Sequence, residues 1–216
     1  MSSPPRPGPG RPVATEQPSK VADVALELFL KHGYDATPMS LVAKQCGLTK
    51  AGIYHHFESK EQLLYYLHKR HIDRLLLPMI DEALKVADPE ERLRKFLSDY
   101  AVLLTRDPTP RLLISETKRL SPEHTEEIRD AWRRGLNLVR DAVRELQARD
   151  GANASRLNPT YAAFAAIGMT SWICNWFDYG HPETGPAVAD TMVEIFLSGL
   201  SPHNQARCTD EDLGPA

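Results

Sequence analysis

The stretch LTKAGIYHHFESKEQL, residues 48–63, decides the fold. Thr49 precedes a short segment with helical apolar spacing, and Ser59 precedes a longer one. Threonine and serine are favoured at helix N-termini, and Ser59 with Gln62 matches the capping box, in which the two side chains satisfy free backbone N–H groups. The sequence therefore predicts a helix of barely two turns over residues 50–56, followed within three residues by a long helix.

Two further helices are expected upstream of this stretch. Apolar residues recur at helical spacing from Val21 until Gly33, where glycine is a plausible stop signal. Thr37 and Pro38 then form an N-cap followed by proline at the first helical position, where its missing N–H costs nothing. The second helix is short and ends at the Cys-Gly pair that finishes at Gly47. The N-terminal part of the chain is thus predicted to contain three helices before the long one.

The rest of the chain also reads as helix. The long helix is expected to run to about Leu76 and to stop before Pro78. Caps and proline or glycine breaks then delimit further helical segments at residues 79–87, 90–105, 109–119, 123–149, 159–179 and 186–199. There is no alternating strand pattern and no internal repeat, so the predicted fold class is all-α. The expected organisation is a disordered tail at 1–18, a DNA-binding domain at 19–65, a helical effector-binding and dimerisation domain at 66–200, and a flexible tail at 201–216.

A brief helix after a glycine-containing turn is typical of the helix-turn-helix, which places one helix in the DNA major groove. That groove is about 12 Å wide, so it suits a short helix with small or planar polar side chains. Residues 1–70 carry nine Lys or Arg against six Asp or Glu, a balance that tolerates a polyanion. The residues expected to contact DNA are Ser40, Thr49, Lys50, Ala51, Gly52, Tyr54, His55 and Lys60.

These residues resemble a known family. Residues 21–67 contain Ala25-Leu26-Glu27-Leu28-Phe29, Gly33-Tyr34-Asp35-Ala36-Thr37, Cys46-Gly47-Leu48 and Gly52-Ile53-Tyr54-His55-His56-Phe57-Glu58-Ser59-Lys60. This segment is similar to the DNA-binding domain of TetR-family transcriptional regulators. The resemblance implies a homodimer that binds an operator in double-stranded DNA, with a helical C-terminal domain that binds an effector. Such proteins usually repress transcription and release the operator when a small molecule binds.

The second half offers candidate ligand residues. The run from Gly168 to Gly180, together with the segment 120–123, is similar to a TetR subgroup that responds to acyl-coenzyme A thioesters. The candidate ligand-binding residues are Trp132, Trp172, Asn175 and Trp176. Packing in the core or at a dimer interface is the alternative for the tryptophan pair, and a structural hydrogen bond is the alternative for the asparagine. Nearby arginines could supply positive charge for coenzyme A, namely Arg119, Arg129, Arg133 and Arg140. The segments 123–149 and 161–179 are the candidates for a dimer bundle.

Other classes of function find little support. The chain has no nucleophile elbow and no glycine-rich phosphate loop after a strand, so no catalytic residue is assigned and an enzyme is not expected. His68 and His71 have a spacing that metal sites use, but no carboxylate or cysteine motif joins them, so packed or solvated histidines are expected and no metal or cofactor. A ligand-independent DNA-binding protein remains an alternative, and it would have a tightly filled C-terminal core.

The expected location is the cytoplasm, without a membrane partner. No apolar run approaches the roughly 20 residues of a membrane helix, and the N-terminus lacks the apolar region of a signal peptide. Three cysteines far apart in the sequence fit reduced thiols better than a disulfide framework.

Overall fold

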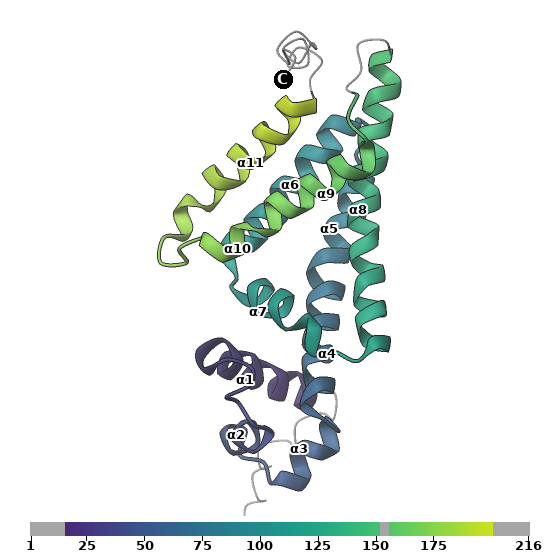
Figure 1. Cartoon of the computed structure of the whole chain (residues 1–216). Coiled ribbons are helices and arrows are strands. Elements are labelled where there is room, and N and C mark those ends of the chain that lie inside the picture. Colours follow the sequence, from purple (N-terminus) through teal and green to yellow (C-terminus); the bar gives the residue numbers. More distant parts are fainter. Residues whose placement is uncertain (1–15, 152–155, 201–216) are drawn as a thin grey trace, which may run out of the picture. The chain divides into compact units, whose positions relative to one another are not determined.

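The computed structural model describes residues 16–151 and 156–200, and every regular element in these ranges is helical (Figure 1). The all-α prediction is therefore confirmed for this part of the chain. The chain forms two compact units, and the boundary between them follows Leu67, within the helix at Lys60–His71. The tails expected at 1–18 and 201–216 lie outside the described residues, except that the first helix already begins at Glu16. No helix in the described ranges is both long and apolar enough to cross a membrane.

The N-terminal unit contains α1 (Glu16–His32), α2 (Met39–Gln45), α3 (Lys50–His56) and the start of α4 (Lys60–His71). The bounds of α3 are those expected from the sequence. The apolar faces of these helices form a small core, because the side chains that recur at helical spacing are buried: Val21, Ala25, Phe29, Met39, Val42, Ile53, Phe57, Leu63 and Leu64.

The start of α2 differs from the prediction. Pro38 occupies the N-cap position without a side-chain hydrogen bond, so Thr37 is not the cap. The Thr37 hydroxyl is buried and donates instead to the carbonyls of Gly33 (2.9 Å) and Leu28 (3.3 Å). The last carbonyls of a helix have no partner within the helix. Thr37 therefore closes the end of α1 rather than opening α2.

The long helix does not stop before Pro78. A π-helical segment, η1 (Ile72–Leu76), follows α4 directly and leads into α5 (Leu77–Leu84), which carries the proline in its first turn. The N–H of Leu77 donates to the carbonyl of Ile72, one residue further back than in an α-helix. This wider turn frees the backbone where proline offers no N–H, so the helical path continues through it.

The C-terminal unit is a layered set of helices. After α5 come α6 (Pro89–Arg106), α7 (Thr109–Glu116), the 3₁₀ turn η2 (Thr117–Arg119), α8 (Pro122–Asp150), α9 (Pro159–Ser171), α10 (Ile173–Trp176), the 3₁₀ turn η4 (Pro182–Thr184) and α11 (Gly185–Leu200). Figure 1 shows α6 beside α11 and α8 beside α9, in agreement with their contacts. Residues of α6, α10 and α11 share one core cluster that includes Tyr100, Leu104, Ile173 and Ala189.

The segment 123–149 was one of two candidates for a dimer bundle, and in the structure its apolar stripe on α8 faces its own unit. Ile128, Val139 and Val143 are buried within the single chain. Because α8 packs against α6 and α9, its apolar face is already covered. The stripe serves the core of its own unit.

Five of the exposed large apolar side chains of this unit lie on α9, α10, α11 and the residue that joins α9 to α10. We call the set Tyr161, Phe164, Trp172, Trp176 and Ile195 the aromatic face. Tyr161 is 73% exposed and Trp172 is 64% exposed. The single helix expected over 159–179 is divided here, since α9 ends at Ser171 and α10 follows one residue later. Large apolar side chains that remain exposed at helical spacing indicate a surface that another molecule covers.

Candidate DNA-recognition helix and effector cavity

The turn before α3 is held by backbone hydrogen bonds at the end of α2. The N–H of Leu48 donates to the carbonyl of Ala43 (2.8 Å), and the N–H of Gly47 donates to that of Lys44 (3.1 Å). This pair of bonds is the Schellman motif, which requires a left-handed residue at its centre. Gly47 has a φ of +66°, which glycine adopts without strain. The turn therefore fixes the direction in which α3 leaves α2.

The helix α3 is short because it is capped at one end and anchored at the other. The Thr49 hydroxyl accepts a hydrogen bond from the N–H of Gly52 (3.0 Å), as the sequence predicted. Ile53 and Phe57 are buried and hold the inner face of the helix against the domain. The N–H of Phe57 closes the last turn on the carbonyl of Ile53 (3.0 Å). One face of α3 is thus fixed, and the other is left to the solvent.

Most residues expected to contact DNA lie on α3 or at its N-cap, while Ser40 lies on α2 and Lys60 on α4. Six of the eight are exposed, and the other two, Gly52 and Lys60, are half-buried; the exposed residues are Ser40, Thr49, Lys50, Ala51, Tyr54 and His55. A Cβ built on Gly52 would lie 3.4 Å from the Thr49 hydroxyl, an ordinary contact. The domain therefore has room for a side chain at residue 52, and its own packing does not require glycine there. The DNA-contact roles of these residues stay predictions.

Lys60 has an additional role that sequence reasoning missed. Its ammonium lies 4.1 Å from the centroid of the Tyr34 ring and donates to the carbonyl of Tyr34 and, at 3.5 Å, to that of Asp35. These contacts attach the start of α4 to the segment between α1 and α2. The cap expected at Ser59 is present, because its hydroxyl accepts from the N–H of Gln62 (2.9 Å). The reciprocal bond is shifted by one residue, since the Gln62 side chain accepts from the N–H of Glu58 (2.7 Å).

A cavity of about 340 Å³ lies in the C-terminal unit, and we call it the chamber. Apolar side chains from α7, α8 and α9 supply most of its wall, namely Ile114, Ile128, Trp132 and Ile167, with Thr117, Thr125, Arg129 and Ser171 as polar members. Its volume is at the low end of the roughly 300–1,000 Å³ range of small-molecule sites. The chamber can therefore hold a small, largely apolar ligand.

Hydrogen bonds and ring contacts hold the wall of the chamber in place. The Ser171 hydroxyl is 2.9 Å from that of Tyr100, which is buried in the core. The Tyr100 ring also meets Trp132 edge to face at 5.9 Å between centroids. Burial raises the pKa of Tyr100, so its hydroxyl stays protonated. Arg129 is exposed and donates to Glu126 at 2.7 Å, so the one charged residue of the wall is already paired.

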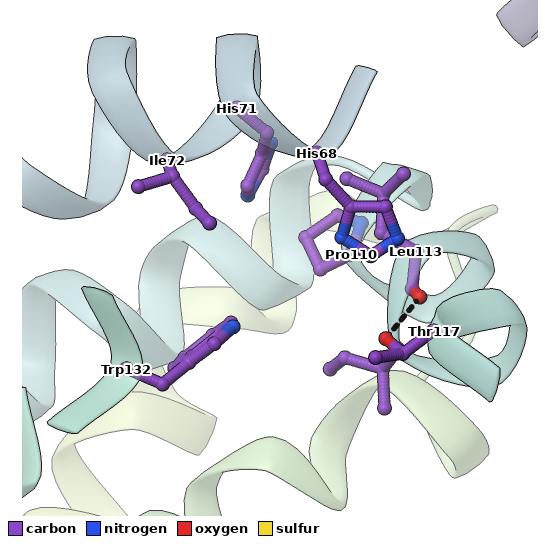
Figure 2. A pocket seen from close by; sticks show the side chains of 8 residues that line it. His68, His71, Ile72, Pro110, Leu113, Thr117 and Trp132 are labelled. Atoms are coloured by element: carbon purple, nitrogen blue, oxygen red, sulfur yellow. Dashed lines mark hydrogen bonds between the residues drawn. The ribbon is translucent and has the colours of Figure 1, made fainter. Parts of the chain in front are cut away.

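A smaller cavity of about 20 Å³ adjoins the chamber (Figure 2). Ile114, Thr117 and Trp132 line both cavities. The remaining wall comes from His68, His71 and Ile72 at the end of α4 and the start of η1, and from Pro110 and Leu113 of α7. A space of this size holds about one water molecule or one small group of a ligand.

Of the two histidines of this smaller cavity, His68 is buried and His71 is half-buried, and the lowered pKa values leave both uncharged at neutral pH. His68 is only 3% exposed, and burial, with the neighbouring His71, lowers its pKa to about 4. Burial also lowers the pKa of His71, against the opposing effect of Asp107. In the described part of the chain, no group of three His, Cys, Asp or Glu residues could hold a metal ion. The pair is therefore part of a cavity wall, a role that sequence reasoning did not assign.

The structure does not bring the four predicted ligand residues together. Trp132 lines both cavities. Trp172, Asn175 and Trp176 are exposed and line neither of them. Asn175 is exposed, and its amide donates to the sulfur of Cys174 at 3.8 Å. The break between α9 and α10 explains the difference, because it separates Trp172 and Trp176 from the helix that lines the chamber.

A fixed short helix with a free outer face and a helical unit that contains a cavity define a helix-turn-helix transcriptional regulator. The chain belongs to the tetR family: residues 21–67 match the family described as bacterial regulatory proteins, tetR family, and residues 86–200 match the tetracyclin repressor-like C-terminal domain.

The chain is similar along most of its length to named regulators. It is 26% identical over 197 residues to the HTH-type transcriptional repressor KstR2 of Rhodococcus jostii, covering 86% of this chain and 92% of that protein. It is also 26% identical over 188 residues to the HTH-type transcriptional activator FasR of Mycolicibacterium smegmatis, covering 86% and 84%. The solved structure of AibR in complex with isovaleryl coenzyme A and operator DNA aligns with a TM-score of 0.73 and 28% identity, covering 86% of this chain and 98% of that one.

Proposed function

We propose that this protein is a homodimeric transcriptional repressor that releases its operator when a small apolar effector occupies the chamber. The observation that carries the proposal is the chamber itself, a space of about 340 Å³ within a helical unit. A ligand-independent DNA-binding protein would be expected to fill that space with side chains, because protein interiors are close-packed. The cavity therefore favours a ligand-responsive regulator over the ligand-independent alternative.

Each subunit would read one half of a palindromic operator with α3. Lys50, Tyr54 and His55 would face the groove and its rims, while Ala51 and Gly52 would let the helix backbone approach the base edges. Dimers of this kind bind half-sites about 34–36 Å apart, or a multiple of that distance. The protein would act on the chromosome and hence in the cytoplasm.

The aromatic face is the surface that we assign to dimerisation. Its side chains come from α9, α10 and α11 and are exposed in the single chain. Water contact with five large apolar side chains is unfavourable, and a second copy can cover them symmetrically. Trp172 and Trp176 therefore fit the alternative reading, in which they pack at an interface.

The effector class that we favour is a short acyl-coenzyme A thioester. The apolar wall suits an acyl group, and Arg129 at the exposed part of the wall could exchange its partner Glu126 for a phosphate. The complex of AibR with isovaleryl coenzyme A supports this choice, because a short branched acyl group suits a chamber of this volume. A different small apolar or aromatic effector is the alternative.

The test begins with the operator, which can be isolated from fragmented genomic DNA with the purified protein. Fluorescence anisotropy of a labelled operator then measures binding while acyl-coenzyme A thioesters of two to ten carbons are added. We expect one range of chain lengths to release the DNA and free coenzyme A to have no effect. Retention of the operator at every chain length would exclude the thioester class, and failure to recover any operator would exclude the regulator itself. Transcription from the operator with and without the protein distinguishes repression from activation.

A further inference from the structure

The smaller cavity contains a buried polar atom without a partner. His68 Nε2 is shielded from solvent and has no hydrogen-bond partner in the described part of the chain. Buried polar atoms of native proteins are almost always hydrogen bonded. Figure 2 shows the His68 ring at the cavity wall, across from Thr117. A hydrogen-bond partner for this nitrogen must therefore come from a molecule other than the described part of the chain.

The wall around this atom is uncharged. It combines aliphatic and aromatic side chains with the neutral imidazoles of His68 and His71 and the hydroxyl of Thr117. That hydroxyl donates to the carbonyl of Leu113 at 2.9 Å, so its proton is already engaged. An ionised carboxylate or ammonium would enter this space without a counter-charge, which is strongly unfavourable. An uncharged group that can form one hydrogen bond fits.

The smaller cavity and the chamber have three wall residues in common. Because Ile114, Thr117 and Trp132 line both spaces, we infer that movement of these side chains joins the two cavities. A ligand with its body in the chamber can thus extend one end toward His68.

We propose that the effector ends in an uncharged oxygen, a carbonyl or a hydroxyl, which enters the smaller cavity and forms a hydrogen bond with His68 Nε2. The inference rests on the proposed effector chamber and narrows the effector class. Effectors whose far end carries such an oxygen bind more tightly than those with a plain hydrocarbon end, because only the former satisfy the nitrogen. When Nε2 carries the proton, it can donate to a carbonyl or a hydroxyl oxygen. In the other tautomer, Nε2 can accept a hydrogen bond from a hydroxyl.

The test compares two probes of the same shape, 4-methylphenol and 1,4-dimethylbenzene, in which a methyl group replaces the hydroxyl. Calorimetry on the full chain gives the ratio of their affinities for wild type, His68→Leu and His68→Gln. His181→Leu is the matched control, since His181 is exposed in the same unit and pairs with Glu183 at 3.2 Å. Nitrogen-15 spectra of histidine-labelled wild type report on the imidazole directly.

We expect wild type and His181→Leu to prefer the phenol, and His68→Leu to shift the ratio toward the hydrocarbon by about tenfold or more. His68→Gln should keep part of the preference, and the phenol alone should shift the His68 Nε2 resonance. Equal affinity ratios in wild type and His68→Leu would overturn the inference, and a water permanently bound at His68 would give that result. Failure of both probes to bind would also overturn it. Operator release by acyl-coenzyme A thioesters that is unaffected by His68→Leu would leave the proposed function intact while rejecting this part of it.

Discussion

At the scale of the residue, a substitution at Gly52 distinguishes an effect on folding stability from an effect on DNA binding. A methyl group at this position meets only an ordinary contact with Thr49, and alanine is favoured over glycine within helices by about 1 kcal/mol. We expect Gly52→Ala to leave the melting temperature equal or higher and to weaken operator binding by about tenfold or more, because the added methyl keeps the helix away from the bases. Calorimetric unfolding and anisotropy with operator DNA measure the two effects. Unchanged affinity would show that α3 does not approach the bases at this residue.

Lys60 combines a structural contact with a predicted phosphate contact. We expect Lys60→Met to lower the free energy of unfolding by about 1 kcal/mol, because the contact with the Tyr34 ring is lost. A plot of log affinity against log salt concentration has a negative slope. We expect this slope to become shallower by about one unit, as for one lost phosphate contact. Denaturant unfolding and a salt titration of operator binding check the two parts separately. A slope equal to that of wild type would leave Lys60 with the structural role alone.

His68 makes stability depend on pH. Its pKa is about 4 in the folded chain, against an ordinary value of 6.5, so the unfolded chain binds more protons between these two values. Stability is therefore fully present above pH 6.5 and falls as the pH decreases toward 4, by roughly 3 kcal/mol for a shift of this size. His71 adds to the loss in the same direction. Denaturant unfolding between pH 7.5 and 4.5 should show this fall, and His68→Leu should make it shallower.

At the scale of the element, local signals predicted helix ends wherever the partner group is close in sequence. The Thr49 and Ser59 caps are examples, because each hydroxyl meets an N–H three residues ahead. Thr37 misled the prediction because its hydroxyl donates backwards, to the carbonyls of Leu28 on α1 and of Gly33 just after it, and does not accept from an N–H ahead. Pro78 misled it because a π-helical turn, which leaves no mark in the pattern of apolar residues, accommodates the missing N–H. Neither arrangement could be read from capping residues and apolar spacing.

The cavities were predicted less well than the α3 helix, and the reason is again distance along the chain. The chamber wall combines α7, η2, α8 and α9, whose relative positions no local pattern specifies. Trp132 was among the predicted ligand residues, whereas Ile114 and Ile167 resemble any core residue and were not. The spacing of His68 and His71 on one helix was noticed, but burial decides their role and the sequence does not reveal it.

The two elements that carry tryptophan allow a matched test of the chamber. Trp132→Ala removes part of the chamber wall, so we expect it to weaken the response to small effectors by about tenfold or more and to admit bulkier ones. Trp176→Ala, on α10, should leave the response nearly unchanged because Trp176 lines neither cavity. Effector titrations of operator-bound protein measure both. The opposite order of effects would move the effector site toward α10.

At the scale of the whole molecule, the aromatic face decides whether two chains associate. Phe164→Glu replaces one apolar side chain of this face by a charge, and we expect it to produce a monomer because an unpaired charge buried at an interface is strongly unfavourable. The monomer should also bind operator far more weakly, since two half-sites can no longer be engaged together. Leu84→Glu is the control, an equally drastic change at an exposed leucine of α5. Sedimentation velocity distinguishes the two variants, and a dimeric Phe164→Glu protein would place the interface elsewhere.

The π-helical segment at residues 72–76 also limits how this protein can be engineered. Each residue of an α-helix advances the chain by about 100° around its axis, so a regular helix made by deleting one residue here would turn everything before it by that angle. His68 and His71 would then leave the cavity wall, although no residue that touches a ligand had been altered. A chimaera that joins this N-terminal unit to another regulator's C-terminal domain must therefore keep the same number of residues between the fusion point and the π-helical turn. Otherwise the side chains of α4 rotate away from the cavity and the effector response is lost.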